Sequence, residues 1–68
     1  QLLIYRDKID DALKMIVLNP EIGLRRRDLP SNYLAYLVGS HIIVYRVNPG
    51  GIGIARILHQ RMSVSLHV

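Results

Sequence analysis

The dipeptide Asn19-Pro20 divides the chain into two parts with different hydrophobic periods. Before it, apolar residues recur every three or four positions, which is the period of an amphipathic helix. This pattern predicts a helix from Leu2 to Leu18. The helix is expected to end there because a residue before proline is pushed out of helical geometry, and proline has no N–H to continue the hydrogen-bond ladder.

The part after Pro30 predicts β-strands. Three runs rich in β-branched and aromatic residues extend over Tyr33 to Val38, His41 to Val47 and Ile52 to His59. They are separated by Gly39-Ser40 and by residues 48–51, and both separators have the composition and length of hairpin turns. We therefore predict an α+β fold, in which one amphipathic helix packs on a three-stranded antiparallel β-meander.

The length of 68 residues allows one domain, which we assign to residues 1–68. A domain of this size buries only roughly 60% of its unfolded surface, so a partner or further chain is expected to add stability.

The absence of cysteine excludes disulfides and thiolate metal sites. No apolar run approaches the roughly 18 residues of a membrane helix, and the first residues do not resemble a signal peptide. We expect a cytoplasmic protein with no membrane contact.

Simple alternation along the three strands predicts that both faces of the sheet are apolar. One face is expected to carry Leu34, Tyr36, Val38, Ile43, Tyr45, Val47, Ile52 and Ile54. The other is expected to carry Ala35, Leu37, Ile42, Val44, Ala55 and Ile57. Because one helix covers only one face, a second covering element is expected from a partner chain or a further segment.

The charges are distributed unevenly along the chain. Nine Lys and Arg against five Asp and Glu give a net charge of +4, and every carboxylate precedes Leu29. The C-terminal half therefore lacks the paired carboxylates that many acid–base enzymes need. Its arginines favour an anionic partner, although a basic surface also serves solubility alone. The basic loop Arg25, Arg26 and Arg27 has the same two interpretations, a partner contact or a solvated charge run.

No metal or other cofactor is expected. The three histidines, His41, His59 and His67, are too scattered in the sequence for a metal-ligand set. The glycine-rich segment 50–53 lacks the Lys and the Ser or Thr of a phosphate-binding loop, and it is interpreted as a hairpin turn.

Several segments in register resemble the ParE branch of the RelE/ParE toxins. Residues 43–47, a glycine turn and residues 55–62 are similar to the closing strands of that family. Residues 19–23 and 27–30 are similar to its link from the second helix to the sheet. The resemblance runs from about Asp7 to Met62. It implies a RelE/ParE-like fold that is N-terminally truncated, because family members usually open with a strand and a first helix.

The resemblance implies a bacterial, cytoplasmic toxin of a type II toxin–antitoxin system of the kind linked to plasmid stabilisation. Such a toxin is a non-enzymatic inhibitor of DNA gyrase, and a cognate antitoxin covers its apolar groove. We expect a homodimer or a toxin–antitoxin hetero-oligomer, with no sequence-specific DNA binding. The candidate partner-binding residues are Arg46, Arg56, His59, Arg61 and Met62.

The sequence is also compatible with two alternatives. The first is a RelE-like, ribosome-dependent mRNA endoribonuclease in which Arg56, His59 and Arg61 are catalytic. That chemistry requires the side chains to converge on one phosphate, whereas Arg56 and His59 differ by an odd number along a strand and should point to opposite faces. The second is an inactive remnant that only binds antitoxin.

Overall fold

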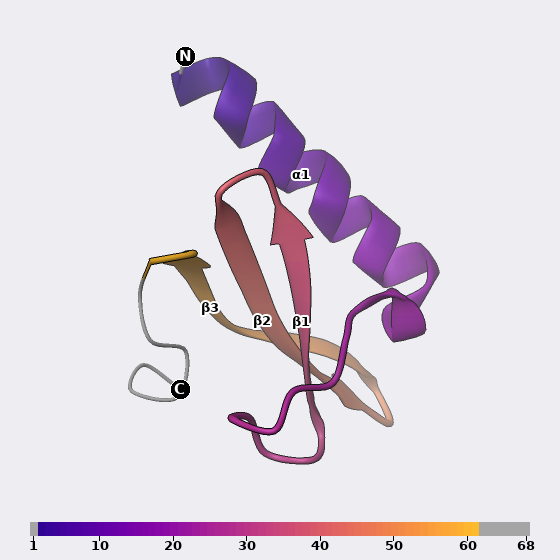
Figure 1. The fold of residues 1–68 in the computed structure, drawn as a ribbon. Helices are drawn as coiled ribbons and strands as arrows, with labels where there is room; N and C mark the ends of the chain where they lie inside the picture. The colour runs from indigo at the N-terminus through magenta and orange to yellow at the C-terminus, as the bar shows by residue number, and fades with distance from the viewer. Residues whose placement is uncertain (1, 62–68) are drawn as a thin grey trace.

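The computed structural model describes residues 2–61 and contains one α-helix and one antiparallel sheet (Figure 1). Helix α1 (Leu2–Leu18) is followed by a short 3₁₀ helix η1 (Pro20–Ile22). Strands β1 (Tyr33–Val38), β2 (His41–Asn48) and β3 (Gly51–His59) form the sheet in the order β1-β2-β3. The predicted α+β fold and the predicted meander are both confirmed.

Helix α1 ends at the position that the proline predicts. The last helical bond is donated by the N–H of Asn19 to the carbonyl of Met15, at 2.9 Å. Pro20 then opens the 3₁₀ turn, which is closed by the N–H of Ile22 and the carbonyl of Asn19 at 3.0 Å. The helix lies along one side of the sheet (Figure 1) and buries Ala12 and Ile16 against it.

Tyr45 fastens the segment after the helix to the middle strand. Its ring is buried in the same cluster as Ile16, and its hydroxyl donates to the carbonyl of Pro20 at 2.6 Å. The same hydroxyl accepts the N–H of Gly23 at 2.9 Å. A Cβ atom at Gly23 would lie 2.5 Å from this oxygen and 3.0 Å from the Cβ of Leu34, so only glycine fits here without a shift.

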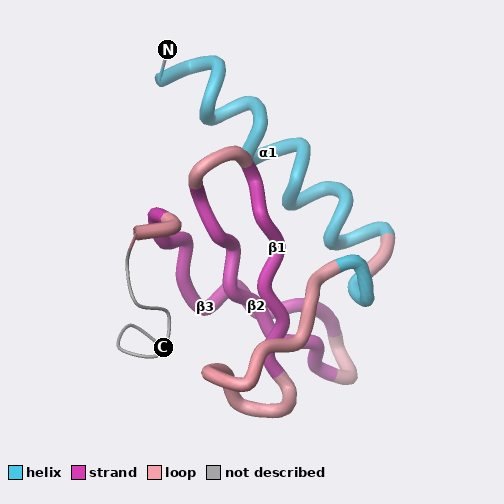
Figure 2. Tube along the Cα trace, viewed as in Figure 1, coloured by secondary structure: helices cyan, strands magenta, loops and turns pink. Residues whose placement is uncertain are grey.

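The loop before β1 covers part of the face that the helix leaves open (Figure 2). Leu29 from this loop is buried with Ala35, Ile42, Val44 and Leu58. At the start of the loop, Leu24 and Ala35 exchange two backbone hydrogen bonds of 2.8 Å. The second covering element that we expected from elsewhere is thus supplied in part by this chain.

A β-bulge in β3 changes which face its last residues occupy. Tyr45 pairs with Ile54 but Val44 pairs with Arg56, so Ala55 is an extra residue between them. Beyond the bulge Ile57 pairs with Ile43 and lies on the helix side of the sheet. The prediction that Ile57 shares a face with Val44 is therefore wrong, because an inserted residue reverses the alternation.

Candidate functional site

Two of the predicted partner-binding arginines lie on one face of the sheet. Arg56 pairs with Val44, and Arg46 lies two residues further along β2, so both belong to the face opposite α1. Both side chains are exposed. On this face, within residues 33–59, Arg46 and Arg56 are the only charged residues, so the local surface is positive.

Glycine at position 53 determines where the Arg46 side chain lies. Gly53 is the pairing partner of Arg46 on β3. A Cβ atom at Gly53 would lie 3.2 Å from Nε and 3.4 Å from Cγ of Arg46. The side chain of Arg46 therefore crosses the backbone of Gly53, and its guanidinium group is carried from the middle strand onto the outer strand.

His59 occupies the other face of the sheet. It pairs with His41 across β2 and β3, and the two rings make an edge contact with centroids 5.4 Å apart and an interplanar angle of 74°. Nδ1 of His59 also accepts the backbone N–H of Arg61 at 3.2 Å. Arg56 pairs with Val44 and His59 pairs with His41, so these two candidates point to opposite faces, as their odd spacing predicts.

Arg61 follows β3 in a turn and is exposed. Its backbone N–H donates to Nδ1 of His59. The backbone N–H of Gln60 donates to the carbonyl of Ser40 at 2.8 Å, which extends the pairing of β2 and β3 by one hydrogen bond. Met62, the remaining candidate, lies outside the described residues. The candidates within the described residues are therefore not brought together: Arg46 and Arg56 share one face, and His59 lies on the other.

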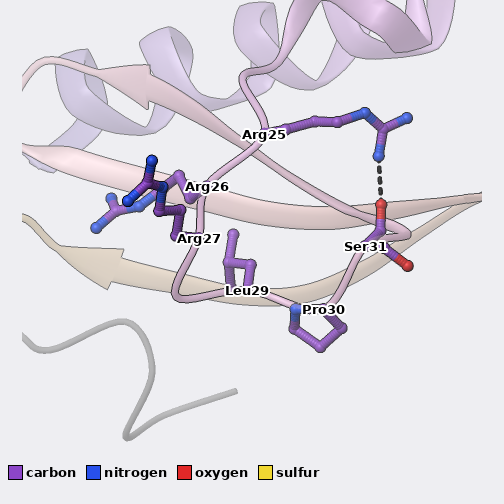
Figure 3. A pocket seen from close by; sticks show the side chains of 6 residues that line it. All are labelled: Arg25, Arg26, Arg27, Leu29, Pro30 and Ser31. Atoms are coloured by element: carbon purple, nitrogen blue, oxygen red, sulfur yellow. Dashed lines mark hydrogen bonds between the residues drawn. The ribbon is translucent and has the colours of Figure 1, made fainter.

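Arg25 points away from the other two arginines of the basic loop, and Arg26 and Arg27 extend toward the same side in this view (Figure 3). Arg25 donates to the backbone carbonyl of Ser31. Arg26 forms a two-bond ion pair with Asp28, with donor–acceptor distances of 2.9 and 2.8 Å. Within the described part of the chain, Arg27 has neither a hydrogen bond nor an ion pair. These arginines line one pocket together with Leu29, Pro30 and Ser31 (Figure 3).

An apolar surface runs from the end of α1 to the β2–β3 hairpin. On the helix, Val17 is 68% exposed and Leu18 is 81% exposed. With Leu13 and Lys14 they line one hollow, and Val17 also lines a second hollow together with Pro20, Val47 and Ile52. We call Leu13, Val17, Leu18, Val47 and Ile52 the apolar groove.

Within residues 2–61, no group of three or more His, Asp or Glu side chains is placed to hold a metal ion. No described helix has both the length and the apolar character needed to cross a membrane.

Sequence reasoning missed two features of these surfaces. The first is the passage of Arg46 over Gly53, for which a glycine inside a strand pattern is the available signal, since it often marks a close approach of another group. The second is the exposed strip of Val17 and Leu18. The sequence predicts that both residues are helical. Which face of the last helical turn meets the sheet depends on the tertiary structure, so the sequence alone does not predict their exposure.

The sequence also matches a known protein family. The model of the ParE toxin of the type II toxin–antitoxin system, parDE, matches residues 3–64. This range includes all three strands, both arginines of the positive face and the whole segment fastened by Tyr45.

Two of the most similar curated relatives are both called Toxin ParE1, from Mycobacterium tuberculosis (strain H37Rv) and Caulobacter vibrioides. The first is 36% identical over 61 residues, which cover 88% of this chain and 62% of the relative. The second is 31% identical over 64 residues, which cover 94% of this chain and 66% of the relative. The chain thus spans about three fifths of the length of the mycobacterial relative. Because the family model matches nearly the whole chain, the protein belongs to the ParE toxin family of type II toxin–antitoxin systems.

Proposed function

We propose that this chain is the toxin component of a toxin–antitoxin pair and that it acts by binding DNA gyrase. Membership of the ParE family supports the toxin assignment, and the positive, carboxylate-free C-terminal half supports action through contacts with another macromolecule. This action takes place in the bacterial cytoplasm, and its biological role is plasmid stabilisation.

One observation favours binding over catalysis. A ribonuclease of the RelE type needs basic groups that converge on a single scissile phosphate, because they activate the 2′-hydroxyl and stabilise the same transition state. Arg56 and His59 lie on opposite faces of β3. These side chains can each contribute to a contact surface, but the sheet lies between them.

The apolar groove is the proposed contact for the cognate antitoxin. Exposed Val17 lines the same hollow as Val47, which is 37% exposed, so the apolar surface is shared by two elements that are distant in the sequence. An amphipathic antitoxin helix would cover such a strip with residues spaced by three and four positions. Arg46, Arg56, His59, Arg61 and Met62 then remain candidates for the contact with gyrase, and Arg25, Arg26 and Arg27 for a further anionic contact.

The test compares two reactions with the purified chain. We expect inhibition of gyrase supercoiling and an altered yield of gyrase cleavage complexes, with no codon-specific cutting of message in a translating extract. Addition of the cognate antitoxin should restore supercoiling. The proposal is contradicted if supercoiling is unchanged while message is cut, which is the RelE-like result. It is also contradicted if the chain binds antitoxin but affects neither reaction, which is the result for an inactive remnant.

A further inference from the structure

The basic loop carries more positive charge than its own carboxylate neutralises. Of its three arginines, Arg26 forms an ion pair with Asp28. Arg25 donates to the neutral carbonyl of Ser31, and Arg27 has no hydrogen-bond or ion-pair partner among the described residues. All three arginines are exposed. Three arginines against one aspartate therefore leave two positive charges in the loop without a counter-charge.

These two charges are held apart on a fixed segment. The bond to Ser31 directs Arg25 away from Arg27 (Figure 3). The segment itself is anchored on both sides, because Leu24 is joined to β1 by two backbone hydrogen bonds of 2.8 Å and Leu29 is buried against the sheet. In this arrangement the two cations address separate anions, which a ligand with repeated charges provides.

The positive charge continues from the loop onto the sheet. Leu29 packs on the face opposite α1, which is also the face of Arg46. Tyr33, the first residue of β1, is the pairing partner of Arg46, and its N–H donates to the carbonyl of Pro30 at 3.0 Å. Strands lie about 4.8 Å apart, so a guanidinium group carried across to β3 lies about 10 Å from β1. The cations are thus spread over a surface and are not gathered at one point.

We infer that the basic loop, together with Arg46, binds the phosphate backbone of duplex DNA. Phosphate groups repeat at regular steps along each strand, and arginine binds their oxygens through charge-assisted hydrogen bonds. Phosphate contacts carry no sequence information, so this binding agrees with the expected lack of sequence-specific DNA binding. The inference rests on the proposed function, because the DNA is the duplex on which gyrase acts.

The lining of the loop hollow favours DNA over an acidic protein segment. Protein interfaces are usually centred on exposed apolar or aromatic anchor positions. Of the six residues that line the hollow, two are apolar, and Leu29 is only 7% exposed, which leaves Pro30 as the exposed apolar side chain there. A phosphate backbone needs no apolar anchor, since its binding is mainly electrostatic.

The experiment measures binding of the full chain to a short fluorescent DNA duplex by anisotropy, without gyrase. We expect binding that weakens steeply as salt is added, because the contacts release counterions from the duplex. Two duplexes of unrelated sequence should bind equally well. Polyglutamate of the same total charge should be a poor competitor, since its carboxylates do not repeat with the geometry of the phosphate backbone.

One set of variants removes single positive charges. Arg27→Ala and Arg46→Ala should each weaken binding by about two- to fivefold, the range of exposed ion pairs. Each should also reduce the slope of log affinity against log salt by about one, as expected for the loss of one phosphate contact. Arg6→Ala on the helix is the control, because it changes the net charge equally but lies outside the proposed surface.

A second pair of variants adds a positive charge. Asp28→Asn releases Arg26 from its ion pair, so a further guanidinium group becomes available to phosphate. Binding should become about two- to fivefold tighter. Asp10→Asn on the helix raises the net charge by the same amount and should leave the affinity nearly unchanged.

Four results would overturn the inference. Two are equal effects of Asp28→Asn and Asp10→Asn, and equal losses in Arg27→Ala and Arg6→Ala. The third is efficient displacement of the duplex by polyglutamate, which would indicate an acidic protein segment, and the fourth is tighter binding of an RNA hairpin of equal charge. Because gyrase is absent, failed DNA binding leaves the proposed function intact, and a failed supercoiling test with intact DNA binding rejects only that function.

Discussion

At the scale of single residues, Tyr45 connects three segments through one hydroxyl group. The Tyr45→Phe variant would leave the N–H of Gly23 and the carbonyl of Pro20 without this partner. Unsatisfied buried polar groups cost about 1–3 kcal/mol, so we expect the free energy of unfolding to fall by this amount. Urea denaturation measures it. Tyr33→Phe is the control, because the Tyr33 hydroxyl forms no hydrogen bond with the described residues, and an equal loss in both variants would contradict the assignment.

The same residue makes stability depend on pH in the alkaline range. Burial raises the pKa of Tyr45 above its ordinary value of 10.0, and the bond from the N–H of Gly23 offsets part of that effect. A raised folded-state pKa adds stability below the unfolded-state pKa, and this stability is lost as pH rises through the folded-state pKa. Denaturation between about pH 8 and about pH 11 should therefore show a larger decline for the wild type than for Tyr45→Phe. Parallel curves would contradict this prediction.

At the scale of elements, the loop before β1 acts as a cover for the second face of the sheet. Leu29 is 7% exposed and packs in the cluster with Ala35, Ile42, Val44 and Leu58, whereas Leu24 in the same loop is 67% exposed. Leu29→Ala should lower the free energy of unfolding by about 2–5 kcal/mol, because it removes buried methyl groups and leaves a cavity. The matched Leu24→Ala variant should change it by less than about 0.5 kcal/mol. Thermal or urea denaturation distinguishes the two, and similar losses would show that the loop does not cover this face as described.

The helix and the three strands were predictable because their signals are local. Pro20 fixes the end of α1 whatever the helix packs against, and the glycine at position 39 adopts the positive φ of 58° that its turn requires. The bulge at Ala55 was not predictable, since it depends on how β3 pairs with β2 and leaves no required residue type behind. The face assigned to Ile57 was wrong for this reason.

The candidate site was predictable only in part. The separation of Arg56 and His59 follows from odd spacing, and the bulge at Ala55 lies outside the interval between them. The position of Arg46 over β3 depends on a glycine in the neighbouring strand, so it requires the register that pairs Arg46 with Gly53. In the basic loop Arg25 is bound by Ser31 and Arg26 by Asp28, and these separate partners direct the two side chains away from each other.

At the scale of the whole molecule, the apolar groove predicts self-association of the isolated chain. Val17 and Leu18 are exposed, although burying such side chains typically contributes about 1.5–3 kcal/mol each. We expect a dimer or larger species in sedimentation experiments at tens of micromolar, and a shift toward monomer in Leu18→Glu. Glu21→Gln outside the groove should not alter the sedimentation. A compact monomer of the wild-type chain at these concentrations would contradict this prediction.

We propose that the chain acts by binding a target and not by catalysing a reaction. His59→Ala distinguishes the two, because one lost interfacial contact typically costs about 1–2 kcal/mol, or roughly five- to thirtyfold in affinity. A lost proton-transfer group would reduce a reaction rate by about 10²–10⁴-fold. Since His59 contacts His41, the folded fraction of the variant is measured first.

The most direct measurement is the concentration of chain that half-inhibits gyrase supercoiling, compared between the wild type and folded His59→Ala. We expect this concentration to rise by roughly five- to thirtyfold in the variant, with full inhibition still reached at saturation. The opposite result is a wild-type chain that leaves supercoiling unchanged and cuts message on the ribosome, at a rate that falls by about 10²–10⁴-fold in the variant.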